Sequence, residues 1–183
     1  MNGKDQAIKE IEEFLESDGK GLLITGTHQY EKHRLVMKIL NKYYKNAHIL
    51  FRINSMDNLT DDAFIGLHKK PKSGERLKIG NNYYEFDSFN TRNTWSKTSN
   101  DFDFAILYPI DALCRSMKKE AIENLYNTKR IGKVFLCSWT DNVNYDFSKF
   151  AEFYSKQVIY DAEEEDPNYH QRVLNNINMK VGI

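Results

Sequence analysis

The sequence predicts a mixed α/β fold built on a mostly parallel sheet of about five strands, with helices on both faces of the sheet in three layers. Short, continuously apolar segments alternate along the chain with longer segments whose apolar residues recur every three or four positions. Continuous apolar runs are typical of strands that helices cover on both faces. At 183 residues the chain has the length of one ordinary domain, so we interpret residues 1–183 as a single domain.

The first half of the chain supplies two of the predicted sheet strands and a hairpin. The predicted elements are a helix at 4–17, a strand at 21–26, a helix at 31–44, a strand at 47–53 and a β-hairpin at 76–88. The hairpin rests on Gly80-Asn81-Asn82, a turn-prone centre between two alternating segments, and we expect it to leave the main sheet. Residues 60–75 are ambiguous between one short helix and a loop.

The second half of the chain continues the alternation. The predicted elements are a strand at 102–110, a helix at 112–127, a strand at 133–138, a helix at 146–155, a strand at 157–160 and a C-terminal helix from about Pro167. Proline suits a first helical turn, where its missing N–H would have no partner in any case.

Charge and composition argue against several classes of protein. The 26 basic and 26 acidic residues cancel, so no overall charge attracts the chain to nucleic acid or to an anionic membrane. No apolar run approaches the ~20 residues that cross a bilayer, and no signal peptide is visible, so we expect a cytoplasmic protein without a membrane contact. The two cysteines lie in apolar segments and the five histidines lack ligand spacing, so we expect no metal site.

Residues 26–33, GTHQYEKH, are the segment most informative about function. They lie between a predicted strand and a predicted helix, where the phosphate-binding pattern G-x-x-x-x-G-K-[ST] would stand. Gly26 and Lys32 match the first glycine and the lysine of this pattern. Glu31 replaces the second glycine, and His33 replaces the hydroxyl residue that binds magnesium.

The order of elements and three local segments resemble P-loop NTPases of the AAA+ and STAND classes. The resemblance implies a P-loop NTPase-like fold with a nucleotide site, and the residues at its positions are Gly26, Thr27, Lys32 and His33. It also implies an acidic segment at the end of a later strand, which here reads AILYPIDAL at 105–113. In that segment Tyr108 and Pro109 occupy the positions of the metal-orienting acid and the catalytic glutamate, and Asp111 matches a later acid. The candidates for the polar sensor residue of the family are Ser138, Thr140 and Asp141.

These departures from the family pattern predict that ATP hydrolysis is lost. Glu31 would repel a phosphate, and His33 cannot hold Mg²⁺. Tyr108 cannot complete a metal shell, and Pro109 cannot orient a water molecule. We therefore expect no catalytic residue, no metal and no cofactor. The sequence favours a non-catalytic interaction or regulatory protein on a degenerate AAA+-like scaffold, which binds a protein partner or serves as an inert subunit in DNA handling.

A divergent nucleotide-binding NTPase or GTPase-like switch remains an alternative. Such a protein would bind ATP or GTP through Lys32 and backbone amides, without a requirement for Mg²⁺. Residues 87–90, DSFN, are faintly similar to the D-x-x-G of GTPases. Residues 138–141, SWTD, keep only the aspartate of N-K-x-D.

A nucleic-acid-binding module over residues 69–86 is the weaker alternative. The candidate contact residues are Lys69, Lys70, Lys72, Arg76, Tyr83 and Tyr84. Aromatic side chains among positive charges can stack on bases and follow a sugar-phosphate backbone. The zero net charge weighs against this hypothesis.

Overall fold

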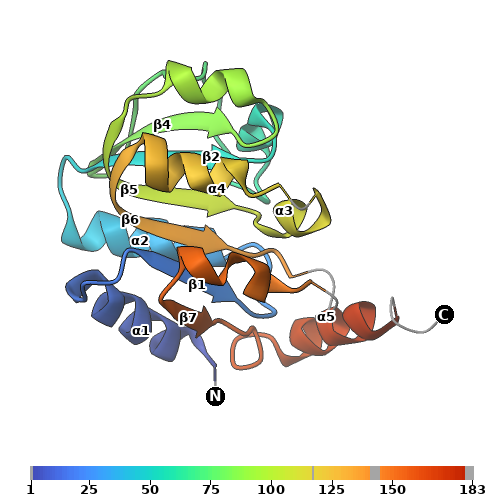
Figure 1. Cartoon of the computed structure of the whole chain (residues 1–183). Coiled ribbons are helices and arrows are strands. Elements are labelled where there is room, and N and C mark those ends of the chain that lie inside the picture. The colour runs from blue at the N-terminus through green and yellow to red at the C-terminus, as the bar shows by residue number, and fades with distance from the viewer. Residues whose placement is uncertain (1, 117, 141–144, 180–183) are drawn as a thin grey trace.

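A mostly parallel sheet runs through the computed structural model, which describes residues 2–116, 118–140 and 145–179 (Figure 1). Within those ranges the sheet has seven strands in the order β3-β4-β2-β5-β6-β1-β7. Every neighbouring pair is parallel except β3 and β4. The mixed α/β class is confirmed, whereas the predicted number of about five strands is too low.

The seven strands are β1 (Gly21–Thr25), β2 (His48–Ile53), β3 (Leu77–Ile79), β4 (Asn82–Ser88), β5 (Asp101–Tyr108), β6 (Arg130–Cys137) and β7 (Lys156–Ile159). Five of them, β1, β2, β5, β6 and β7, lie where continuous apolar runs predicted them. The antiparallel hairpin of β3 and β4 is confirmed, but the expectation that it leaves the main sheet is wrong. β4 pairs in parallel with β2, up to the register Ile53↔Ser88, and so extends the sheet.

The helices agree less closely with the prediction. The α-helices are α1 (Lys4–Glu16), α2 (Lys32–Tyr43), α3 (Asp111–Ser116), α4 (Glu120–Glu123) and α5 (Pro167–Met179), and the other helical segments are η1 (Met56–Thr60), η2 (Arg92–Lys97), η3 (Asn124–Thr128) and η4 (Phe147–Phe153). No helix among the described residues is long and apolar enough to cross a membrane.

The single helix predicted at 112–127 is wrong, because this stretch holds three shorter pieces. α3 and α4 are separate α-helices, and η3 is a short π-helix that directly follows α4. Leu113 and Leu125 nevertheless lie in the same buried cluster, so the four-residue spacing detected the shared burial and not the continuity of the helix. The helix predicted at 146–155 is the 3₁₀ helix η4, and the short helical segment η1 ends where the ambiguous stretch 60–75 begins.

Alternate residues of the strands contribute to two clusters of buried apolar side chains. Leu22 and Ile24 of β1 lie in the cluster that α1 and α2 complete. Leu23 lies in the second cluster, together with residues of α3, α4, η2 and η4. Both sides of the central strands are therefore buried, which explains their unbroken apolar sequences.

The connections that follow the neighbouring strands β1 and β6 lie on opposite faces of the sheet. After β1 it enters α2, which packs in the cluster of Leu22, whereas after β6 it reaches η4, which packs in the cluster of Leu23. In open α/β sheets such a divergence leaves a crevice outside the carboxyl ends of the strands, and ligands bind there. The loop that follows β1 therefore lies outside the carboxyl end of a strand, at such a divergence.

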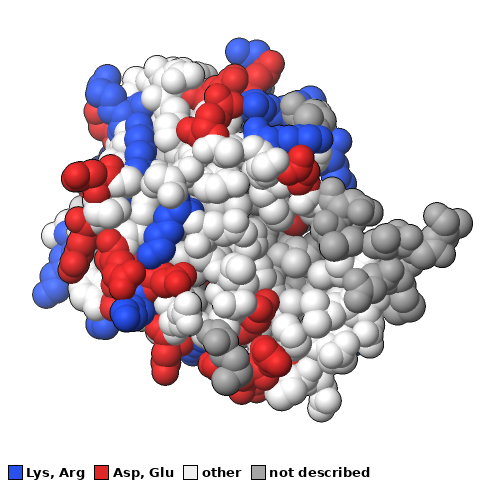
Figure 2. Space-filling view, turned by 60° about the horizontal axis from the view of Figure 1, so that its bottom comes forward, with Lys and Arg blue, Asp and Glu red and all other residues white. Residues whose placement is uncertain are grey.

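Charged side chains of both signs are interspersed on the surface. On the face seen in Figure 2, basic and acidic groups lie in small neighbouring sets, and a wide area between them carries neither. This distribution matches the zero net charge of the chain.

Candidate functional site

The loop after β1 begins at Gly26, in a backbone conformation that favours glycine. The φ angle of Gly26 is 115°, in the region that side chains rarely adopt. A Cβ atom at this position would overlap the backbone of Tyr160, which directly follows β7. Gly26 therefore permits a close approach between the loop and the chain beyond β7.

The first two N–H groups of the loop after Gly26 are already used. The N–H of Thr27 donates to Oδ1 of Asp161 at 2.8 Å, and the N–H of His28 donates to the carbonyl oxygen of Tyr160 at 3.2 Å. The hydroxyl of Thr27 lies 2.7 Å from Nδ1 of His170. A phosphate loop presents free N–H groups to its ligand, whereas these groups bind the chain itself.

Lys32 is turned into the loop. Its side chain is buried, and its Nζ donates to the carbonyl oxygens of Gly26 at 2.6 Å and His28 at 3.0 Å. It also lies 3.4 Å from Oγ1 of Thr140. Burial lowers the pKa of Lys32 to about 7, although the carboxylate of Asp111 acts in the opposite direction. The ammonium group of this lysine thus satisfies carbonyl oxygens of its own loop.

Glu31 does not enter the loop. Its backbone has a φ angle of −107°, so the residue in place of the second glycine adopts an ordinary conformation. Its carboxylate points outward and pairs with Arg34 at 3.7 Å and Lys38 at 3.5 Å. The loop is therefore closed by Lys32 and Asp161, and not by Glu31.

His33 packs inside the protein. Its Nε2 lies 2.5 Å from the carbonyl oxygen of Phe64, and its ring stacks on Tyr108 with centroids 4.0 Å apart. Burial lowers the pKa of His33 to about 3, so the ring is neutral at physiological pH and its Nε2–H donates. Its Nδ1 has no hydrogen-bond partner among the residues that the structure describes. The residue in the position of the magnesium ligand is thus a core side chain.

Tyr108, at the end of β5, fills the space beside the loop. Its hydroxyl donates to the carbonyl oxygen of Gln29 at 3.2 Å, and burial raises its pKa. A cis peptide bond joins Tyr108 to Pro109. Tyr108 thus supports the loop through this hydrogen bond and through its ring contact with His33.

Asp111 connects the loop to the segment after β6. Its carboxylate accepts from the N–H of Trp139 at 2.5 Å and from the N–H of Thr140 at 3.0 Å. Burial raises the pKa of Asp111, and these hydrogen bonds oppose the rise. The hydroxyls of Ser138 and Thr140 lie 2.8 Å apart. The structure thus brings Lys32 together with Asp111, Ser138 and Thr140, whereas Asp141 lies outside the described residues.

The segment from Tyr160 to His170 covers the loop, and the sequence pattern did not reveal this. The hydroxyl of Tyr169, in α5, donates to Oε1 of Gln29 at 2.9 Å. Nε2 of His28 lies 3.1 Å from Oε2 of Glu165, in the acidic run before α5. These contacts join residues more than a hundred positions apart, as the separation of 143 between Thr27 and His170 illustrates, so no local pattern could predict them.

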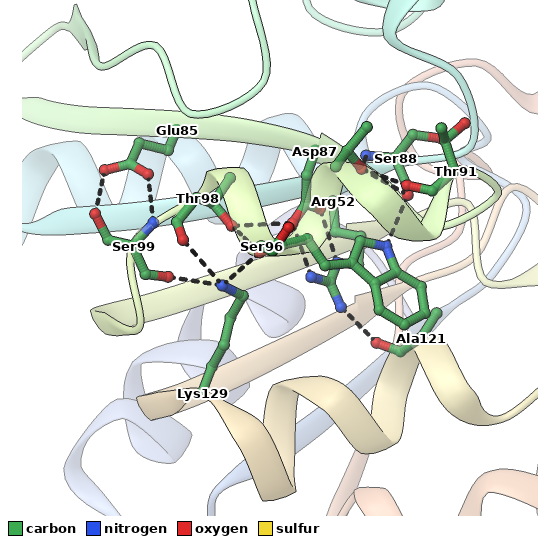
Figure 3. A network of polar contacts seen from close by, with 12 residues as sticks. Arg52, Glu85, Asp87, Ser88, Thr91, Ser96, Thr98, Ser99, Ala121 and Lys129 are labelled. Carbon is green, nitrogen blue, oxygen red and sulfur yellow. Dashed lines mark hydrogen bonds and ion pairs between the residues drawn. The ribbon is translucent and has the colours of Figure 1, made fainter.

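Asp87, the first residue of the segment 87–90, belongs to a buried ion pair (Figure 3). Nε and Nη2 of Arg52 each lie 2.7 Å from a carboxylate oxygen of Asp87, and both side chains are fully buried. The hydroxyl of Thr98 also donates to Asp87. Asp87 therefore holds η2 against the sheet, in a position that is closed to a nucleotide.

The residues predicted to contact nucleic acid do not form one surface. Tyr84 is 1% exposed and belongs to the apolar core, because β4 lies inside the sheet, so its predicted role in stacking on bases is wrong. Tyr83 is half-buried. The four basic residues are exposed, namely Lys69, Lys70, Lys72 and Arg76. Two of them already form ion pairs, because Arg76 pairs with Glu85 at 3.4 Å and Lys70 pairs with Asp57 at 2.6 Å.

Comparison with models of known protein families and with curated protein sequences gave no match. Within the described ranges, no group of three or more His, Cys, Asp or Glu side chains could hold a metal ion.

Proposed function

We propose that this protein is a non-catalytic interaction or regulatory protein, built on a degenerate P-loop NTPase-like scaffold of three α/β/α layers. The two apolar clusters on alternate residues of the strands support the layered arrangement. A loop between β1 and α2, with Lys32 beside Asp111 and Ser138, supports the relation to the P-loop class. The missing metal and water ligands at Tyr108 and Pro109 favour a scaffold without hydrolysis.

The contact between Lys32 and the carbonyl oxygens of its loop carries this proposal. A bound phosphate would need the ammonium group of Lys32 and the free N–H groups of the loop. Lys32 donates instead to Gly26 and His28, and the N–H of Thr27 donates to Asp161. The carboxylate of Asp161 is thus a group of the chain itself that already accepts from the first N–H of the loop after Gly26. A nucleotide would have to displace this carboxylate to use that N–H.

The surface beside the closed loop favours a protein partner. Tyr30 is 38% exposed, and its ring lies 6.0 Å from that of Trp139. Tyrosine and tryptophan are enriched at the centres of protein–protein interfaces. Binding of a nucleic-acid backbone would need a continuous basic surface, and the charges in Figure 2 are mixed in sign.

Nucleotide binding and hydrolysis test the first half of the proposal. We expect any change in melting temperature caused by millimolar ATP or GTP, with and without Mg²⁺, to be the same in the wild type and in Lys32→Met, because a ligand raises the melting temperature only by binding the native state. We also expect no release of phosphate. Lys32→Met keeps an unbranched side chain and serves as the matched variant. A nucleotide-dependent rise in melting temperature that this variant loses would favour the nucleotide-switch alternative and contradict our proposal.

Site-specific crosslinking tests the second half. A photo-reactive phenylalanine analogue replaces Tyr30 in one variant and Tyr43 in the other. Tyr43 is 50% exposed and lies at the opposite end of α2, so it controls for random contacts. We expect one protein to be captured from position 30 and not from position 43, and its binding to purified protein to be lost in Tyr30→Ala. Identical products from both positions would argue against an interface at Tyr30.

A further inference from the structure

An open hollow of about 610 Å³ lies away from the loop of Lys32, at the ends of β2 and β4. Three segments line it: residues 55–57, which follow β2, residues 70–73, which precede β3, and residues 88–97, which begin at the last residue of β4. The hollow thus brings together three parts of the chain that are separate in sequence.

The topology of the sheet explains why a hollow forms here. β2 and β4 are parallel neighbours that end at Ile53 and Ser88. After β2 the chain passes into η1, whose Leu59 packs in the cluster of α1 and α2. After β4 it passes into η2, whose Trp95 packs in the opposite cluster. The divergence leaves a crevice outside the carboxyl ends of both strands, which is where open α/β sheets bind ligands.

The lining of the hollow is basic and rich in hydroxyl groups. It contains Lys70, Lys72 and Lys97 but only one acidic side chain, Asp57. Lys70 pairs with Asp57 at 2.6 Å, whereas the structure shows no ion pair between Lys72 or Lys97 and any residue that it describes. The hydroxyl-bearing residues of the lining are Ser55, Ser73, Ser88, Thr91 and Thr94. Ser88 and Thr94 are buried, and their hydroxyls donate to carbonyl oxygens of the chain. Lys72 and Lys97 therefore remain for an anion, together with the hydroxyls of Ser55, Ser73 and Thr91.

Buried polar contacts hold the wall of the hollow in place. Nζ of Lys129 donates to the carbonyl oxygen of Ser99 at 2.7 Å (Figure 3) and to that of Trp95 at 3.0 Å. The indole N–H of Trp95 donates to the carbonyl oxygen of Ser88 at 2.8 Å. The segment that carries Lys97 is thus fixed to the end of β4 before any ligand binds, which reduces the entropy that binding would cost.

We propose that this hollow binds a small molecule that carries a phosphate monoester or a diphosphate. Lysine ammonium groups bind phosphate as point charges, and hydroxyls of serine and threonine donate to its oxygens. The volume lies within the range of about 300–1,000 Å³ that is usual for small-molecule sites. A nucleic acid fits the hollow less well, because none of the described residues that line it carries an aromatic ring on which a base could stack.

Calorimetric titration of the full chain with inorganic pyrophosphate and with adenosine 5′-monophosphate tests the proposal, with sulfate as the general anion. The double variant Lys72→Gln/Lys97→Gln removes two charges from the hollow. The double variant Lys45→Gln/Lys69→Gln removes two charges from exposed positions outside its lining and is the matched control. We expect saturable binding of at least one phosphate compound by the wild type. The dissociation constant should rise about tenfold or more in the first variant and stay within about twofold in the second.

Three results would overturn the proposal. The first is that the wild type binds neither phosphate compound more tightly than sulfate. The second is equal weakening in both double variants, which would mean that general charge attracts the anion. The third is that an oligothymidylate of ~15 nucleotides binds more tightly than the small compounds and displaces them, with a steep dependence on salt, because the surface would then be a nucleic-acid site. All three readouts are independent of Lys32.

Discussion

The ammonium group of Lys32 lies 2.6 Å from the carbonyl oxygen of Gly26. These two residues are the ones that the chain keeps from the P-loop pattern, and they bind each other. Asp161 binds the N–H of Thr27 in the same loop. The ammonium group of Lys32 and one N–H group of the loop thus have partners within the chain itself.

Replacement of Lys32 by methionine should change how stability depends on pH. The pKa of Lys32 is about 7 in the folded protein and near 10.5 in the unfolded chain. Between these values only the unfolded chain holds the proton, so the free energy of unfolding rises with pH, by at most roughly 1.4 kcal/mol per pH unit. Urea denaturation from pH 6.5 to 10 measures this rise. We expect it to disappear in Lys32→Met and to persist in Lys38→Met, whose side chain is exposed. An identical rise in both variants would contradict the burial of the ammonium group.

His33 should make the protein sensitive to acid. Its pKa is about 3 in the folded state against 6.5 in the unfolded chain, because burial disfavours the charged ring. As the pH falls from 6.5 towards 3, the unfolded chain takes up a proton that the folded state does not, and the free energy of unfolding decreases. His33→Phe keeps an aromatic ring beside Tyr108 and should flatten this decrease. His68→Phe, at an exposed position, should leave it intact, as denaturation curves at pH 4 and 6.5 would reveal.

The loss of the buried ion pair between Arg52 and Asp87 should lower the free energy of unfolding far more than the loss of a similar pair on the surface. Asp87→Ala leaves the guanidinium of Arg52 buried without its partner, so we expect a loss of about 3–5 kcal/mol in the free energy of unfolding. The matched control is Asp101→Ala, which breaks the exposed pair with Arg130 and should have no measurable effect. Chemical denaturation of both variants checks the difference. Equal losses of stability in the two variants would contradict the expectation that burial makes the partner of Arg52 more important for stability.

Gly26→Ala tests the close approach between the loop and the chain after β7. Alanine at a φ angle of 115° is strained, and its Cβ would overlap the backbone of Tyr160. We expect a loss of about 2–3 kcal/mol in the free energy of unfolding, measured by denaturation in urea. A variant as stable as the wild type would show that the loop can move away from Tyr160.

Local patterns predicted β1 and α2 to within about one residue, because the strand is a continuous apolar run and the helix repeats its apolar residues on one face. They failed where contacts distant in sequence decide the outcome. Glu85 and Asp87 lie within the hairpin predicted at 76–88, and both are buried in β4. Their carboxylates find partners in Ser99 and Arg52. A charged group can be buried only where it finds partners, and residues close to it in the sequence do not indicate those partners.

The sequence by itself determined the α/β class, the order of the strands along the chain and the position of a loop between β1 and α2, because hydrophobic periodicity is a local property. Only the tertiary structure decided what that loop does. Lys32 could point outward to a phosphate or inward to Gly26, and the choice depends on the chain that covers it. Asp161 and His170 lie near the far end of the sequence, and both form hydrogen bonds with Thr27 of the loop. A buried polar group must find partners, and here the fold supplies them from within the protein.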